Sequence, residues 1–168
     1  SPLHPTVHLR GEAGELHIDL ALQWTGAYAE HVSSYVNSIR TTQGGTHQDG
    51  LAHAITQVIN RYAVSNRLLN QEAGEEIAGY DIREGLTCVL SLRMAQPEFE
   101  GQTKNKLGNP EVRTQVETVV AEAVQIYLED HPQDAKKIIE KCTTARRARE
   151  AARKAGSYTP LTLPTKRI

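Results

Sequence analysis

The pattern of hydrophobic and polar positions predicts three β-strands. Residues 15–24 alternate between hydrophobic and polar side chains, as a strand does when one of its faces is buried. After a turn at residues 25–28, residues 30–39 are rich in strand-favouring residues, and we expect this second strand to run antiparallel to the first. Residues 86–94 predict the third strand. The hydrophobic positions that alternate in the first and third strands are Leu16, Ile18, Leu20, Leu22, Leu86, Cys88, Leu90 and Leu92.

Hydrophobic residues at helical spacing predict three helices. The first covers about four turns over residues 51–62. The second covers residues 110–128, where Asn109 as N-cap and Pro110 at the first helical position mark a good start. A third helix follows and ends in the polar segment 145–155. The hydrophobic stripe of the first helix consists of Leu51, Ala54, Ile55, Val58, Ile59 and Tyr62.

Two shorter motifs each allow a structural and a functional interpretation. Asp81 and Glu84 have the spacing of a helix-capping pair, which we favour over a catalytic acid and base. The Gly-Gly-Thr-His segment at residues 44–47 could let backbone amides approach a phosphate. It lacks the complete phosphate-loop patterns, so a tight turn with Thr46 capping the next helix is the favoured interpretation.

The order of the expected elements is strand, strand, helix, strand, helix, helix. This order predicts an α/β (α+β) fold with a small mixed sheet, helices packed on one face and a projecting C-terminal helix. Residues 1–155 are expected to form one domain. Residues 156–168 contain two prolines and show no helical period, so we expect a flexible or cloning-derived tail there.

Composition restricts the class of protein further. The chain has 168 residues, of which 39% are hydrophobic and 23% charged, as in a soluble globular protein. No hydrophobic run reaches the length of a membrane span, and the first residue is not Met, which suggests a piece of a longer chain. Cys88 and Cys142 lie far apart in the sequence, and the seven histidines are not clustered. We therefore expect no disulfide, no metal site, no membrane partner and a cytoplasmic location.

The charge of the chain is unevenly distributed. Residues 136–154 contain eight Lys or Arg against two Glu, a local charge of +6 in a chain whose net charge is −1. Such a run is usually the solvated face of a helix, but it could also follow a DNA backbone without reading its sequence. The candidate DNA contacts are Arg146, Arg147, Arg149 and Arg153.

The segment 98–109 connects the third strand to the second long helix. It contains Lys104 and Lys106 between glycine and amide residues, in the sequence EFEGQTKNKLGN. Most lysine-rich loops are only solvated, although a lysine on a loop after a core strand is well placed to reach a terminal phosphate. The pattern of residues leaves both interpretations open.

Four motifs together resemble one known family. Residues 37–51 (NSIRTTQGGTHQDGL), 80–86 (YDIREGL), 97–113 (PEFEGQTKNKLGNPEVR) and 145–155 (ARRAREAARKA) are similar to motifs of the B subunit of bacterial DNA gyrase, in the type IIA DNA topoisomerase family. The resemblance extends from about residue 3 to residue 154. It covers the transducer domain, the second domain of the ATPase half of that subunit.

The resemblance implies a fold and a site. The fold of this family is the ribosomal protein S5 domain 2-like two-layer sandwich. In the family, the loop that matches residues 102–104 reaches into the ATP site of the preceding domain. By resemblance, Lys104 contacts the γ-phosphate and is the catalytic residue of this chain, and Gln102 lies beside it. ATP is the expected cofactor, with its Mg²⁺ bound mainly by the ATPase domain, which is absent here.

The resemblance also implies partners and leaves two alternatives. The expected partners are the chain's own ATPase domain, the gyrase A subunit, double-stranded DNA and a second B subunit. The isolated fragment is expected to be inactive, and in the whole enzyme it would transmit the nucleotide state to the DNA gate during supercoiling. The alternatives are the corresponding domain of a topoisomerase IV B subunit and a non-enzymatic nucleic-acid-binding domain of the S5-like fold.

Overall fold

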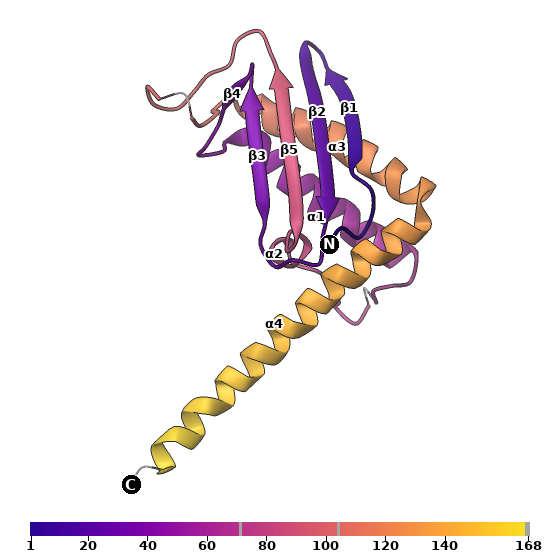
Figure 1. Ribbon diagram of the computed structural model, residues 1–168, viewed down its shortest axis with the longest axis vertical. Helices are drawn as coiled ribbons and strands as arrows, with labels where there is room; N and C mark the ends of the chain where they lie inside the picture. Colours follow the sequence, from indigo (N-terminus) through magenta and orange to yellow (C-terminus); the bar gives the residue numbers. More distant parts are fainter. Residues whose placement is uncertain (71, 104, 167–168) are drawn as a thin grey trace.

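A five-stranded mixed sheet forms one layer of the protein (Figure 1). The computed structural model describes the backbone of residues 1–70, 72–103 and 105–166, and side chains as far as residue 155. The strands lie in the order β1-β2-β5-β3-β4. β3 and β5 are parallel, and the other neighbouring pairs are antiparallel. Their bounds are Val7–Ala13 (β1), Leu16–Trp24 (β2), His31–Val36 (β3), Ile39–Arg40 (β4) and Leu86–Arg93 (β5).

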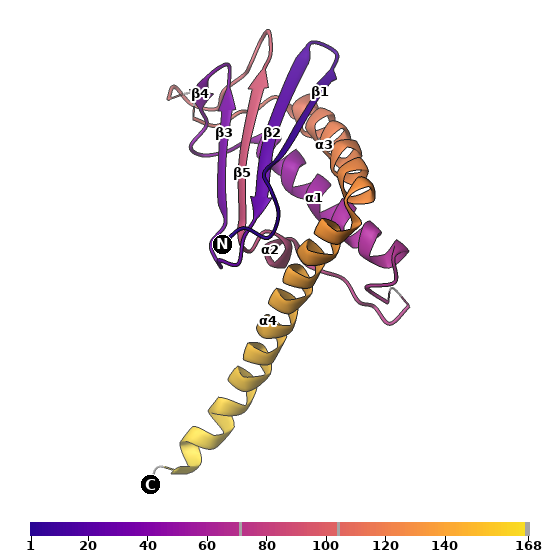
Figure 2. The same ribbon diagram turned by 45° about the vertical axis from the view of Figure 1, so that its right-hand side comes forward.

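Helices cover one face of this sheet. The helices are α1 (Thr46–Ser65), α2 (Gly79–Ile82), α3 (Pro110–Asp130) and α4 (Pro132–Lys166). α1 and α3 pack side by side against the sheet, while α4 leaves the domain and projects away from it (Figures 1 and 2). The predicted fold class, with a mixed sheet, helices on one face and a projecting C-terminal helix, is confirmed.

The core between the two layers is aliphatic. Alternate residues of β2 and β5 face the stripes of α1 and α3, and most of these side chains are almost completely buried. Trp24 is the largest of the buried side chains, and its indole nitrogen donates to the carbonyl oxygen of Ile82 at 2.8 Å. In the described part of the chain, none of the helices combines the length and apolarity needed to cross a bilayer.

The second predicted strand runs antiparallel to the first, as expected, but the two strands are not neighbours in the sheet. β5 lies between β2 and β3, and Trp24 pairs with Leu86 on one side of it while His31 pairs with Thr87 on the other. The connection after β2 therefore passes around the start of β5, where the Thr25 amide donates to the carbonyl oxygen of Gly85 at 2.9 Å. A short turn between two strands suggests a hairpin, but the pairing partner came from a distant part of the chain.

β1 is not among the strands that the sequence predicts. Its inward positions after Val7 are occupied by Leu9, Gly11 and Ala13, so the strand lacks a strong hydrophobic alternation. Small residues are needed because α3 crosses β1 closely: a β-carbon at Gly11 would lie 2.3 Å from a side-chain carbon of Val119. Because α3 packs so closely against β1, the strand needs small residues and lacks the hydrophobic alternation by which it could have been predicted.

Two expectations about helix ends, those for α1 and α2, need correction. α1 has Gly45 at its N-cap, and the hydroxyl group of Thr46 has no hydrogen-bond partner among the described residues. α2 begins at Gly79, so Asp81 lies inside it and is not its N-cap. The backbone of α4 continues as helix to Lys166, past the expected start of a tail at residue 156. Asn109 and Pro110 do occupy the N-cap and first positions of α3, as predicted.

Candidate functional site

The connection between β5 and α3 folds back on itself as a narrow loop. The Glu100 amide donates to the carbonyl oxygen of Lys106 at 2.8 Å, and the Gly108 amide donates to that of Glu98 at 2.7 Å. The loop lies at the same end of the sheet as β4 (Figure 1). Gln102 is exposed near its tip. Lys104, the predicted catalytic residue, lies outside the described residues.

The base of the loop is buried and is fastened to the Gly-Gly turn before α1. Leu107 is completely buried, its amide donates to the carbonyl oxygen of Gly44 at 3.0 Å, and its own carbonyl oxygen accepts from the Thr46 amide at 3.1 Å. Nearby, the Gln43 amide donates to the carbonyl oxygen of Asn105 at 2.8 Å. The turn and the loop therefore form one backbone-bonded unit.

Glycine is required at one position of this turn. Gly45 has a φ of 133°, and a β-carbon there would lie 2.3 Å from the carbonyl oxygen of Leu107. Two amides of the segment are already bonded, that of Thr46 to the loop and that of Gly44 to the carbonyl oxygen of Thr41. This geometry favours the structural interpretation of the Gly-Gly-Thr-His segment over a phosphate cradle, although the expected cap by Thr46 is absent.

Asn109 closes the other end of the loop. Its side-chain oxygen accepts from the Glu98 amide at 2.6 Å, and its side-chain nitrogen donates to Gln96 and Glu111. Asn109 is buried, so it joins the start of the loop to the start of α3. Sequence analysis assigned this residue only a capping position.

Of the two loop lysines, Lys106 is the one that lies among the described residues. Lys106 lies 3.4 Å from the carboxylate of Glu100, and both side chains are about half exposed. This ion pair is formed within the loop itself, between the segment before its tip and the segment after it. Lys106 is therefore a suitable internal control for any test of Lys104.

A chain of polar side chains lies beneath the Gly-Gly turn. Gln48 donates to the hydroxyl group of Ser34 at 2.6 Å, and the hydroxyl groups of Ser34 and Thr41 are 2.6 Å apart. The Thr41 hydroxyl lies 2.8 Å from Nε2 of His47. His47 is completely buried, and this burial lowers its pKa to about 4. Sequence analysis could have found His47, because it lies one turn before Leu51 on the buried stripe of α1.

Two ion pairs join α4 to the region of α2. Nε of Arg149 lies 3.2 and 3.0 Å from the two carboxylate oxygens of Asp81, which is buried, and the guanidinium group lies 5.0 Å from the ring of Tyr80. Nζ of Lys141 lies 3.2 Å from the carboxylate of Glu84. The predicted capping pair of Asp81 and Glu84 is thus wrong, because both carboxylates bind cations of α4.

The four candidate DNA-contacting arginines have different surroundings. Arg149 binds Asp81, and Arg146 lies 3.1 Å from Glu150 one turn further along α4. Arg147 and Arg153 are exposed. The basic face of α4 is therefore only partly a row of solvated cations, since one of its arginines anchors the helix.

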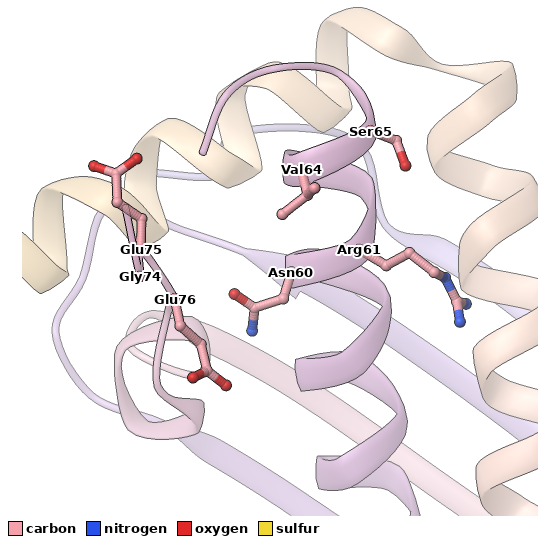
Figure 3. A pocket seen from close by; sticks show the side chains of 7 residues that line it. All are labelled: Asn60, Arg61, Val64, Ser65, Gly74, Glu75 and Glu76. Atoms are coloured by element: carbon pink, nitrogen blue, oxygen red, sulfur yellow. The ribbon is translucent and has the colours of Figure 1, made fainter. Parts of the chain in front are cut away.

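A hollow of about 580 Å³ lies at the far end of α1 (Figure 3). It is lined by the end of α1 and by residues 74–76, and its acidic residues are Glu75 and Glu76. Arg61 points away from these carboxylates, and the amide group of Asn60 bonds the backbone of Ile77. These groups do not converge on a common point, so the hollow is a weaker candidate than the loop.

Neither thiol chemistry nor metal binding has support in the described part of the chain. Burial raises the pKa of the thiol groups of Cys88 and Cys142 to about 12, so both are un-ionised at neutral pH. Among the described residues, no three His, Cys, Asp or Glu side chains lie together as metal ligands would. The loop after β5 remains the candidate with the best-defined geometry.

Comparisons with known proteins agree with the resemblance in the motifs. Residues 2–157 match the family model of DNA gyrase B. The DNA gyrase B protein of Streptomyces coelicolor is 47% identical over 160 residues, which make up 94% of this chain and 23% of that protein. The chain thus spans about a quarter of the length of this curated relative.

Solved structures with the same fold are also found. The 43K ATPase domain of Thermus thermophilus gyrase B, in complex with an aminocoumarin, superposes with a TM-score of 0.84 and 38% identity over 92% of this chain and 41% of that one. The topoisomerase IV ATP-binding domain of Francisella tularensis gives a TM-score of 0.76 and 31% identity, over 86% and 39% of the two chains.

Proposed function

Because the chain belongs to the DNA gyrase B family, we propose that it is the transducer domain of an ATP-dependent type IIA DNA topoisomerase of the gyrase type. Its loop at residues 98–109 would contact ATP that is bound by a preceding ATPase domain. The observation that carries this proposal is the construction of the loop: Leu107 and Asn109 are buried at its base, while Gln102 is exposed near its tip. A loop built in this way presents its tip to a neighbouring domain from a fixed base.

The chemistry of the tip suits a terminal phosphate. Lys104 supplies a positive charge to the γ-phosphate, and Gln102 supplies amide donors beside it. Charge develops on the γ-phosphate during hydrolysis, so a lysine held there accelerates the reaction as well as binding the substrate. After hydrolysis the contact is lost, and the domain is released to change its position relative to the ATPase domain.

The ATP site would be completed by residues outside this chain. One charged hydrogen bond contributes about 1.5–3 kcal/mol, whereas even millimolar binding requires about 4 kcal/mol. The isolated chain is therefore proposed to be inactive and to bind ATP negligibly. Mg²⁺ would accompany the nucleotide and be held mainly by the ATPase domain.

The change at the loop would be passed on through α4. This helix is fixed to the domain by Asp81 and Glu84, so it moves together with the sheet. In the intact enzyme it would transmit the nucleotide state towards the DNA gate. The partners in this proposal are the ATPase domain, a second B subunit, the gyrase A subunit and double-stranded DNA, in the cytoplasm. The 47% identity to a gyrase B protein favours gyrase over topoisomerase IV.

Rates of ATP hydrolysis test this proposal, measured on the chain joined to its upstream ATPase domain. Lys104→Ala should reduce turnover by about a hundredfold or more, because the developing charge loses its partner. Lys106→Ala is the matched control and should stay within about threefold, since Lys106 is paired with Glu100. Gln102→Ala should fall between the two. Parental turnover by Lys104→Ala, or a larger loss in Lys106→Ala, would refute the assignment of the loop.

A further inference from the structure

The polar side chains beneath the Gly-Gly turn are connected to the loop through backbone bonds. Thr41 is buried, and its carbonyl oxygen accepts from the Gly44 amide at 3.0 Å. Gly44 in turn accepts from the amide of Leu107 at the base of the loop. The Thr41 side chain lies 2.8 Å from His47, in the first turn of α1. The Gly-Gly turn, which holds the loop, thus lies between two buried side chains, Thr41 and His47, that are bonded to each other.

The hydrogen bonds of this group require one arrangement of protons. The Thr41 hydroxyl donates to the carbonyl oxygen of Ser34 at 3.0 Å, which leaves its oxygen as an acceptor. The Ser34 hydroxyl then donates to Thr41, and Nε2 of His47 does the same. In this arrangement Nδ1 of His47 is unprotonated, in agreement with its lack of a hydrogen-bond partner within the described residues. The reverse tautomer would bury an unpaired donor, which is more costly.

We infer that Thr41 and His47 are positioning residues for the loop at residues 98–109. They touch no substrate. Together with Ser34 and Gln48 they hold the Gly-Gly turn in its left-handed conformation, and this turn holds the backbone of Leu107. His47 stays neutral at physiological pH, so the same set of donors and acceptors persists under working conditions. Only the expected effect of these two residues on ATP hydrolysis rests on the proposed function.

If Thr41 only stabilised the fold, its loss would speed amide exchange throughout the domain. If Thr41 positions the loop, its loss should speed exchange at the base of the loop more than in the central strand. Amide hydrogen exchange is measured by NMR on the 168-residue chain, and the exchange rate of Leu107 is divided by that of Leu90 in the central strand. Thr41→Val removes the hydroxyl group at nearly constant volume and should raise this ratio by about tenfold or more. Thr41→Ser keeps the hydroxyl group and should restore the parental ratio. Thr56→Val is the matched control, because the Thr56 hydroxyl group donates to the carbonyl oxygen of Ala52 within α1, away from the Gly-Gly turn.

An unchanged ratio in Thr41→Val would overturn the inference. The same holds if Thr56→Val raises the ratio equally, because the effect would then come from general destabilisation. If Thr41→Val does not fold, Gln48→Met takes its place with the same two outcomes. It removes the donor to Ser34 at the less buried end of the group.

A second measurement keeps the inference separate from the proposed function. In the chain joined to its ATPase domain, Thr41→Val should lower kcat by about tenfold and leave the KM for ATP nearly unchanged. Thr41→Ser should recover kcat. If the exchange ratio rises while kcat does not fall, the loop is positioned as inferred but the proposed contact with ATP is wrong. If the exchange ratio does not rise, the positioning role itself is wrong.

Discussion

Arg149 on the projecting helix donates from Nε to both carboxylate oxygens of Asp81, at 3.2 and 3.0 Å. Asp81 is buried, whereas the arginine side chain remains about one-third exposed. Arg149 also continues the spacing of the buried residues of α4, since it lies four positions after Ala145. The ion pair therefore continues the packed stripe of α4 one turn beyond Ala145.

Loss of this arginine should destabilise the domain more than loss of a neighbouring arginine. Arg149→Met leaves a buried carboxylate without its cation, and the thermal midpoint should fall by roughly 5 °C. Arg147→Met removes an exposed side chain from the same helix and should change the midpoint by about 1 °C or less. Differential scanning calorimetry provides the comparison. Equal midpoints for the two variants would show that the ion pair is not a structural anchor.

The close approach of Gly45 to Leu107 predicts a strong effect of one added carbon. Gly45→Ala places a β-carbon 2.3 Å from a backbone oxygen and should cost about 3 kcal/mol or more in the free energy of unfolding. Gly101→Ala, in the loop that packs against this turn, is the matched control, because φ is also positive there but none of the described atoms lies within 4 Å of the new carbon. It should cost only about 1 kcal/mol. Urea denaturation measures both, and similar costs would contradict the packing of the turn against the loop.

The buried His47 should make stability depend on pH. Its pKa is about 4 in the folded chain and near 6.5 when unfolded. As pH falls, the unfolded chain therefore takes up the proton first, and stability is lost between pH 6.5 and pH 4. The loss attributable to this residue approaches about 3 kcal/mol. His47→Gln keeps a donor at the end of its side chain but does not titrate, so its unfolding free energy should vary less between pH 7 and pH 4. Parallel pH profiles of parent and variant would contradict this assignment.

DNA binding by α4 is expected to be weak, independent of sequence and steeply dependent on salt. Replacing Arg146, Arg147, Arg149 and Arg153 with Gln should abolish it. The ion pair of Arg149 with Asp81 refines this prediction, because the quadruple variant should also lose thermal stability. The single variant Arg147→Gln, at an exposed position, should weaken binding without this loss of stability and so separates the two effects. Fluorescence anisotropy with a duplex at two salt concentrations gives the result, and unaltered binding in the quadruple variant would place the DNA surface elsewhere.

Local patterns predicted the elements that build the core, and they failed where the structure depends on distant contacts. The alternation in β2 and β5 and the stripe of α1 were sufficient, because burial of one face leaves a regular mark on the sequence. No local pattern in the sequence indicated that β5 lies between β2 and β3. Asp81 and Glu84 were misassigned because a capping pair and two long-range ion pairs have the same spacing within the short helix.

The candidate site was located by resemblance and explained by the structure. Nothing in the pattern of residues distinguished Lys104 from a solvated lysine, because the role proposed for it, a contact with a ligand of another domain, leaves no trace in hydrophobic periodicity. The base of the loop could have been predicted in part. Leu107 is the only aliphatic residue between residues 98 and 109, and it is completely buried.

The ion pair between Arg149 and Asp81 also sets the rotational phase of everything that follows it on α4. An α-helix turns by roughly 100° and advances about 1.5 Å per residue. One residue inserted just after Arg149 would therefore keep the ion pair but rotate the continuation of the helix by about 100° relative to the domain. An insertion of seven residues at the same place, about two turns, would restore the phase to within roughly 20° and move the continuation about 10 Å further along the axis. Beyond this anchor, an added length of two turns thus preserves the direction in which the helix presents its side chains, whereas a single added residue does not.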